Sequence, residues 1–67
     1  MDVATREMIE EAYFETTSEA LGREVNKIQA HKEGITAAAM LLAAMLGMED
    51  DDAKSQIVEL NLRPDMN

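Results

Sequence analysis

Basic side chains recur at a spacing of four in the middle of this otherwise acidic chain. Arg23, Lys27 and His31 follow one another in this way, and Lys32 comes directly after them. Residues four apart lie on one face of a helix, so these side chains would form one ridge. Such groups bind phosphate or carboxylate oxygens, and Tyr13 is a candidate stacking platform for an attached ring. The ridge predicts a site for a small anionic ligand such as a nucleotide; the alternative is that its members form salt bridges with glutamates.

Other combinations of residues that could carry chemistry are incomplete. His31 is the only histidine, and no serine has an evident base with an orienting acid. Cysteine is absent, and one histidine cannot close a zinc site. The acidic run at 49–52 does not continue as a calcium loop, because counting from Asp50 the sixth and twelfth positions are Ser55 and Asn61 instead of glycine and glutamate. We therefore expect a non-enzymatic protein without a metal or cofactor.

Acidic residues outnumber basic ones by 14 to 6, which gives a formal net charge of −8. They are concentrated near both ends of the chain. The acids that we expect to form a partner surface are Glu10, Glu11, Glu15, Asp50, Asp51 and Asp52. This charge disfavours direct contact with nucleic acid or an anionic membrane. It would instead steer a basic protein partner toward the chain.

The basic ridge requires a helix through the first half of the chain. The spacing of apolar residues predicts one long helix over about 3–32, with Asp2 or Thr5 as its cap. Two apolar stripes in this segment are offset near Gly22, which predicts a bend there; two separate helices are the alternative. Gly34 follows two basic residues, as is typical of a helix C-terminus, and is expected to end this helix.

Apart from Thr36, the segment from Ile35 to Met48 is apolar. We expect Thr36 to cap a second helix, apolar over 37–46, that ends at Gly47. The segment is about 14 residues, too short to span a bilayer. A helix that is apolar all round must be covered all round, and one long helix with a tail cannot do this. We therefore expect a homo-oligomer, a dimer or larger. The expected interface residues are Met40, Leu41, Leu42, Met45 and Leu46.

The acidic run predicts the start of a third helix over about 51–62. Apolar residues at 57, 58, 60 and 62 also alternate in part, which leaves an extended arm as the alternative. Arg63 and Pro64 should end the order, so we predict a mobile tail over 63–67. Residues 1–67 thus form a single all-α domain, a helical hairpin with an appendage in an oligomeric bundle.

Three functions fit these features. The first is an acidic homo-oligomer that acts as an inhibitor or adaptor by binding a basic protein. The second is an oligomer that sequesters a small anionic ligand at a subunit interface through the basic ridge. The third is a structural subunit of a larger assembly. The absence of cysteine fits a cytoplasmic location, and the size, acidity and helical make-up are of the kind seen in small phage and accessory bacterial proteins.

Overall fold

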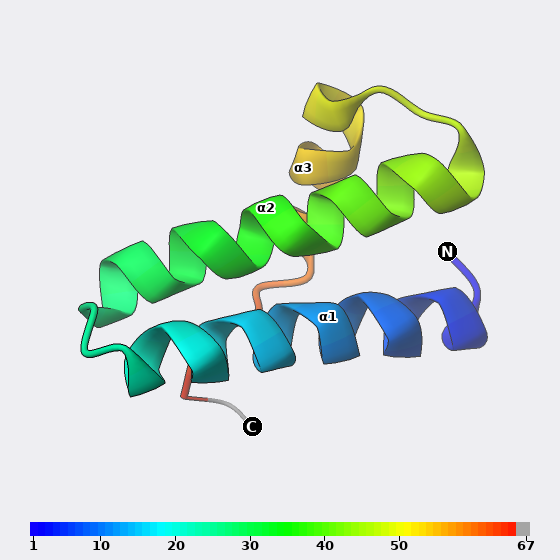
Figure 1. Cartoon of the computed structure of the whole chain (residues 1–67). Helices are drawn as coiled ribbons and strands as arrows, with labels where there is room; N and C mark the ends of the chain where they lie inside the picture. The colour runs from blue at the N-terminus through cyan, green and yellow to red at the C-terminus, as the bar shows by residue number, and fades with distance from the viewer. Residues whose placement is uncertain (66–67) are drawn as a thin grey trace.

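The computed structural model describes residues 1–65, which fold into three helices. They are α1 (Val3–Gly22), α2 (Lys27–Leu46) and α3 (Asp50–Glu59). α1 and α2 run antiparallel as a hairpin, and α3 packs against α2 (Figure 1). The described part of the chain contains no strand, which confirms the all-α class. None of its helices is long and apolar enough to cross a membrane.

The chain reverses direction between α1 and α2. α1 ends at Gly22, and Glu24 has a φ of +68°, a left-handed conformation that a right-handed helix does not contain. Asn26 then caps α2, because its side chain accepts a hydrogen bond from the backbone N–H of Gln29 at 2.8 Å. The prediction of one bent helix over 3–32 is therefore wrong, and the alternative of two separate helices is confirmed.

Gly34 lies inside α2 and faces α1. A β-carbon at this position would lie 2.6 Å from Thr17 Cγ2 and 2.7 Å from Tyr13 Cδ2, so the packing leaves no room for a side chain. Tertiary packing explains the glycine, although it costs about 1 kcal/mol relative to alanine in a helix interior. The predictions that Gly34 ends the first helix and that Thr36 caps the second are wrong.

The hydrophobic core forms where α1 and α3 each meet α2. The buried residues of this core are Ile9, Tyr13, Ile35, Ala38, Ala39, Leu42, Ala53, Ile57 and Leu62. The alanines allow the neighbouring helices to approach α2 closely, while each large apolar side chain contributes about 1.5–3 kcal/mol by leaving water. α2 is thus the central element of the fold.

Local backbone chemistry sets the later helix ends. Gly47 has a φ of +67° and donates its N–H to the carbonyl of Ala43 at 2.8 Å, which confirms the predicted end of the second helix. α3 follows Glu49 and carries three aspartates in its first turn, where the helix dipole favours negative charge. It ends at Glu59, because Asn61 has a φ of +56°. The helical alternative is confirmed here, with an earlier end than predicted.

After α3 the chain turns back beside the hairpin. Leu62 is buried, and Asp65 Oδ2 lies 3.8 Å from Lys27 Nζ at the start of α2. The described part of the predicted mobile tail therefore lies against α2. Met66 and Asn67, the rest of that predicted tail, lie outside the described residues.

Candidate functional site

The four basic residues of the predicted ridge do not share one helix. Arg23 follows the end of α1, and its guanidinium donates a hydrogen bond to Glu33 Oε1 at 2.6 Å. Lys27 is the first residue of α2, and His31 follows one turn later. Lys32 is exposed and lines a different hollow from those two. The chain reversal before α2 thus removes Arg23 from the ridge, and only Lys27 and His31 come together.

Tyr13 and His31 form a hydrogen bond between α1 and α2. The distance between Tyr13 Oη and His31 Nδ1 is 2.6 Å. The Tyr13 ring is fully buried and packs edge-on against Phe14, with ring centroids 5.1 Å apart. Burial, and to a lesser extent the negative charge of Asp65, raises the pKa of the Tyr13 hydroxyl above 10.0. Tyr13 therefore orients His31 and offers no open face to a ligand, which corrects its predicted role as a stacking platform.

A hollow of about 310 Å³ opens between the first turns of α2 and the segment after α3. Its lining residues are Lys27, Ile28, His31, Arg63, Pro64 and Asp65, and we call it the basic hollow. Lys27 and Asp65 are both mostly exposed, so their 3.8 Å ion pair is weak. A neighbouring hollow of about 250 Å³ shares His31 and Arg63. Three basic side chains from two distant segments thus border one concave surface.

Arg63 is the member of this site that the sequence did not reveal. It has no spacing relationship with Lys27 or His31, and only the turn after α3 places it beside them. The available signal was Leu62, an apolar residue directly before Arg63 that is buried in the fold. A buried neighbour indicates that this segment packs against the helices.

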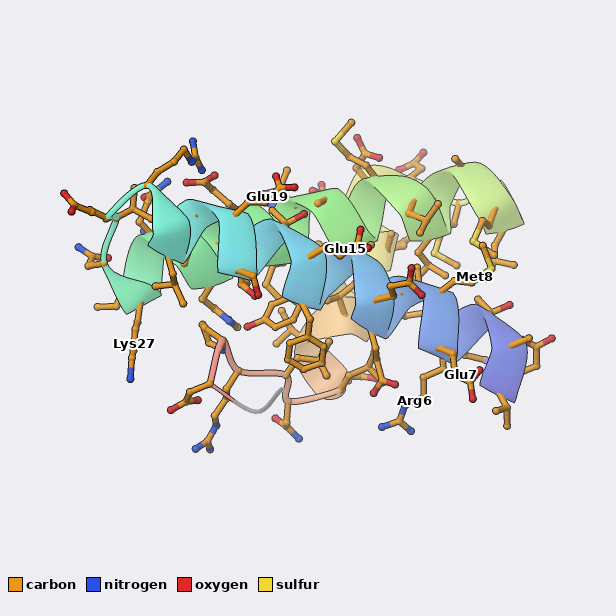
Figure 2. All side chains as sticks on the ribbon, turned by 60° about the horizontal axis from the view of Figure 1, so that its bottom comes forward. Arg6, Glu7, Met8, Glu15, Glu19 and Lys27 are labelled. Atoms are coloured by element: carbon orange, nitrogen blue, oxygen red, sulfur yellow. The ribbon has the colours of Figure 1, made fainter. Side chains whose placement is uncertain are left out.

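Exposed glutamates follow one another at a spacing of four along α1. These residues, which we call the acidic stripe, are Glu7, Glu11, Glu15 and Glu19. Figure 2 labels three of them along the length of α1. Of the predicted acidic surface, Glu11 and Glu15 belong to this stripe, whereas Glu10 lies 3.4 Å from Arg6 in an ion pair.

The remaining acids of the predicted surface lie elsewhere. Asp50, Asp51 and Asp52 are exposed in the first turn of α3. α1 and α3 each pack on α2, which lies between them (Figure 1). The predicted acidic surface therefore consists of two separate patches.

Large apolar side chains remain exposed mainly at one end of the hairpin, where α1 begins and α2 ends. We call this the open end. Its exposed apolar residues are Met1, Val3, Met8, Met45 and Leu46. Met40, which precedes these residues on α2 and lies outside the open end, is 63% exposed. Leu42 is fully buried and Leu41 packs partly buried against the core. These two predicted interface residues thus belong to the fold of one chain, whereas Met40, Met45 and Leu46 are accessible to a partner.

No protein-family model, curated protein or solved structure matches this chain. Within residues 1–65, no three histidine, aspartate or glutamate side chains are grouped so that they could hold a metal ion. The surfaces described above are therefore the basis for a functional assignment.

Proposed function

We propose that this chain is a homo-oligomeric binding protein that acts as an inhibitor or adaptor for a basic protein partner. Two surfaces have separate roles in this proposal. The exposed apolar residues of the open end join copies of the chain, and the acidic stripe contacts the partner.

The acidic stripe is the observation that carries the proposal. Like charges four residues apart destabilise a helix by about 0.2–0.5 kcal/mol per pair, and the stripe contains three such pairs in succession. The one basic residue within α1 is Arg6, which pairs with Glu10 instead. No side chain of α1 therefore relieves the repulsion along the stripe. A partner with basic residues would relieve it, and the negative field would speed their association.

The open end supports self-association. A chain of this length buries a limited share of its apolar surface, and further copies are a common means of covering the rest. Contiguous exposed apolar side chains are typical of protein interaction sites. Met8 is 49% exposed and Leu46 51% exposed. A two-fold pair that joins its open ends would bury both residues in each copy and leave the acidic stripes accessible.

Solution mass tests the self-association. We expect multi-angle light scattering to give a dimer or larger species for the wild-type chain at micromolar concentration and a shift toward monomer for Leu46→Glu, which places a charge in the open end. Val58→Glu is the matched control, because Val58 is similarly exposed but lies on α3. A folded wild-type monomer, or equal dissociation of both variants, would contradict the proposed oligomer.

Charge reversal tests the acidic stripe. We expect a basic protein captured from host extract by the wild-type chain to be released by salt and to be lost with Glu11→Lys/Glu15→Lys. Glu49→Lys/Glu59→Lys is the control, because it changes the net charge equally at exposed positions outside α1. Equal capture by both double variants would refute a role for the stripe.

A further inference from the structure

The basic hollow concentrates positive charge in an acidic protein. Three of the chain's seven basic residues border it, although the formal net charge is −8. Ile28 and Pro64 provide apolar surface beside these groups. A volume of about 310 Å³ is at the lower end of the range for small-molecule sites. The combination suits a ligand with one anionic end and one apolar end.

We propose that the basic hollow binds a small organic anion, in which a phosphate or carboxylate group is attached to an apolar body. Lys27, His31 and Arg63 bind the anionic group, and Ile28 with Pro64 contacts the body. This site differs from the ridge expected from sequence, because Arg63 takes the place of Arg23. The proposal does not depend on the proposed oligomer or on the acidic stripe.

Asp65 already places an oxyanion at this site. Its Oδ2 lies 3.8 Å from Lys27 Nζ, and its charge reaches far enough to act on the Tyr13 hydroxyl. The two side chains are 70% and 64% exposed, so water competes strongly for both and the pair is easily separated. Asp65 therefore acts as an internal competitor that a ligand anion displaces.

Tyr13 prepares His31 to donate a hydrogen bond to the anion. When the imidazole is neutral and Nδ1 accepts from the Tyr13 hydroxyl, the ring proton is on Nε2. When the imidazole is protonated, Nδ1 donates to Tyr13 Oη and Nε2 still carries a proton. Nε2 is a donor in both of these states, whereas it would be an acceptor in the neutral tautomer whose proton is on Nδ1. Because the Tyr13 ring is buried, this orientation is held by the fold itself.

An NMR titration of the isotope-labelled full chain with phenyl phosphate tests the site. We expect saturable shifts of the His31 ring and the Arg63 amide, weaker saturable shifts with inorganic phosphate, and none with phenol. Benzoate, run in parallel, shows whether a carboxylate replaces the phosphate group. Shifts with phenol equal to those with phenyl phosphate, or no saturable shift with any anion, would overturn the proposal.

Three substitutions distinguish binding in the basic hollow from an effect of the chain's net charge. Arg63→Ala should weaken phenyl phosphate binding about tenfold, as expected for loss of one charge-assisted hydrogen bond at an exposed site. Lys54→Ala removes the same charge from an exposed position on α3 and should change the affinity little. Asp65→Asn should tighten binding roughly threefold or more, because the competitor is gone. Equal loss in Arg63→Ala and Lys54→Ala, or weaker binding in Asp65→Asn, would overturn the proposal. Both Arg63 and Asp65 are exposed and outside the helices, so these variants should keep the wild-type spectrum.

Discussion

Replacement of Gly34 by alanine tests whether close packing of α1 on α2 holds the hairpin together. The new methyl group would lie 2.6 Å from Thr17 Cγ2 and 2.7 Å from Tyr13 Cδ2. Normal carbon contacts begin near 3.5 Å, so the helices would have to separate by about 1 Å. Overpacking of this kind costs about 1–3 kcal/mol. The strain also acts on the Tyr13 ring, whose hydroxyl bonds His31 and cannot move freely.

Gly22→Ala is the matched comparison, because both glycines belong to helices and alanine favours a helix by up to about 1 kcal/mol. A β-carbon at Gly22 would meet nothing within 4 Å. Gly22 is the last residue of α1, so alanine gains no more helix propensity there than at Gly34 inside α2, and a lower stability of Gly34→Ala reflects the packing cost. We expect Gly34→Ala to be less stable than Gly22→Ala by about 1–3 kcal/mol.

Thermal and denaturant unfolding, followed by far-ultraviolet circular dichroism at one protein concentration, measures this difference. For a domain of this size, each kcal/mol corresponds to roughly 4–8 °C in Tm. Gly22→Ala should melt at or above the wild-type temperature, and Gly34→Ala below it. Equal stability of the two variants would refute the conclusion that Gly34 is required for close helix packing.

Three further predictions concern the helix caps and the hydrogen bond between Tyr13 and His31. Asn26→Ala should destabilise the fold by about 1 kcal/mol in denaturant unfolding, because the N-cap of α2 is lost; an unchanged midpoint would contradict this. Hydrogen bonds from Thr5 lower the pKa of the Asp2 carboxyl below 3.8, so its stabilisation is present above that range and is lost as the pH falls through the lowered pKa. The stabilisation of the wild-type chain relative to Asp2→Asn should therefore decrease on acidification and stay constant above about pH 6. Tyr13→Phe should lower the free energy of unfolding by about 1 kcal/mol and shift the NMR signals of His31. The stability of the wild-type chain should also fall as the pH rises above 10.0. The pKa of Tyr13 is raised in the fold, so the folded state is favoured only while the hydroxyl is protonated.

The sequence predicts a helix end correctly where a residue's effect on the backbone depends only on its immediate neighbours in the chain. Asp2 accepts a hydrogen bond from the N–H of Thr5 at 2.8 Å, and Gly47 adopts the left-handed conformation, both as their positions in the sequence predict. Asn26 has the same capping chemistry, but apolar residues on both sides of it favoured a continuous helix. Gly34 is ambiguous on sequence alone, since the glycine of a helix end and the glycine of a tight helix contact look alike. The contact depends on side chains of α1 that lie far away in sequence.

The same distinction between local and tertiary information explains which residues of the basic hollow could be predicted from the sequence. The pair of Lys27 and His31 was predictable, because four-residue spacing on α2 is a local property. Arg63 was not, since its position depends on the left-handed turn at Asn61 and on burial of Leu62. The exposure of Met40 and the burial of Leu42 were likewise decided by which side of α2 the other helices cover.

Gly34 lets α2 approach Thr17 and Tyr13 of α1 closely, whereas methionines and a leucine remain exposed on the two helices at the open end. α1 and α2 are farther apart at the open end than at their connection (Figures 1 and 2). The hairpin is therefore a wedge, held narrow by the missing side chain at Gly34. A larger residue there would change the taper and, with it, the shape of the apolar surface at the wide end. One glycine thus couples the stability of a single chain to the geometry of the surface that we propose for self-association.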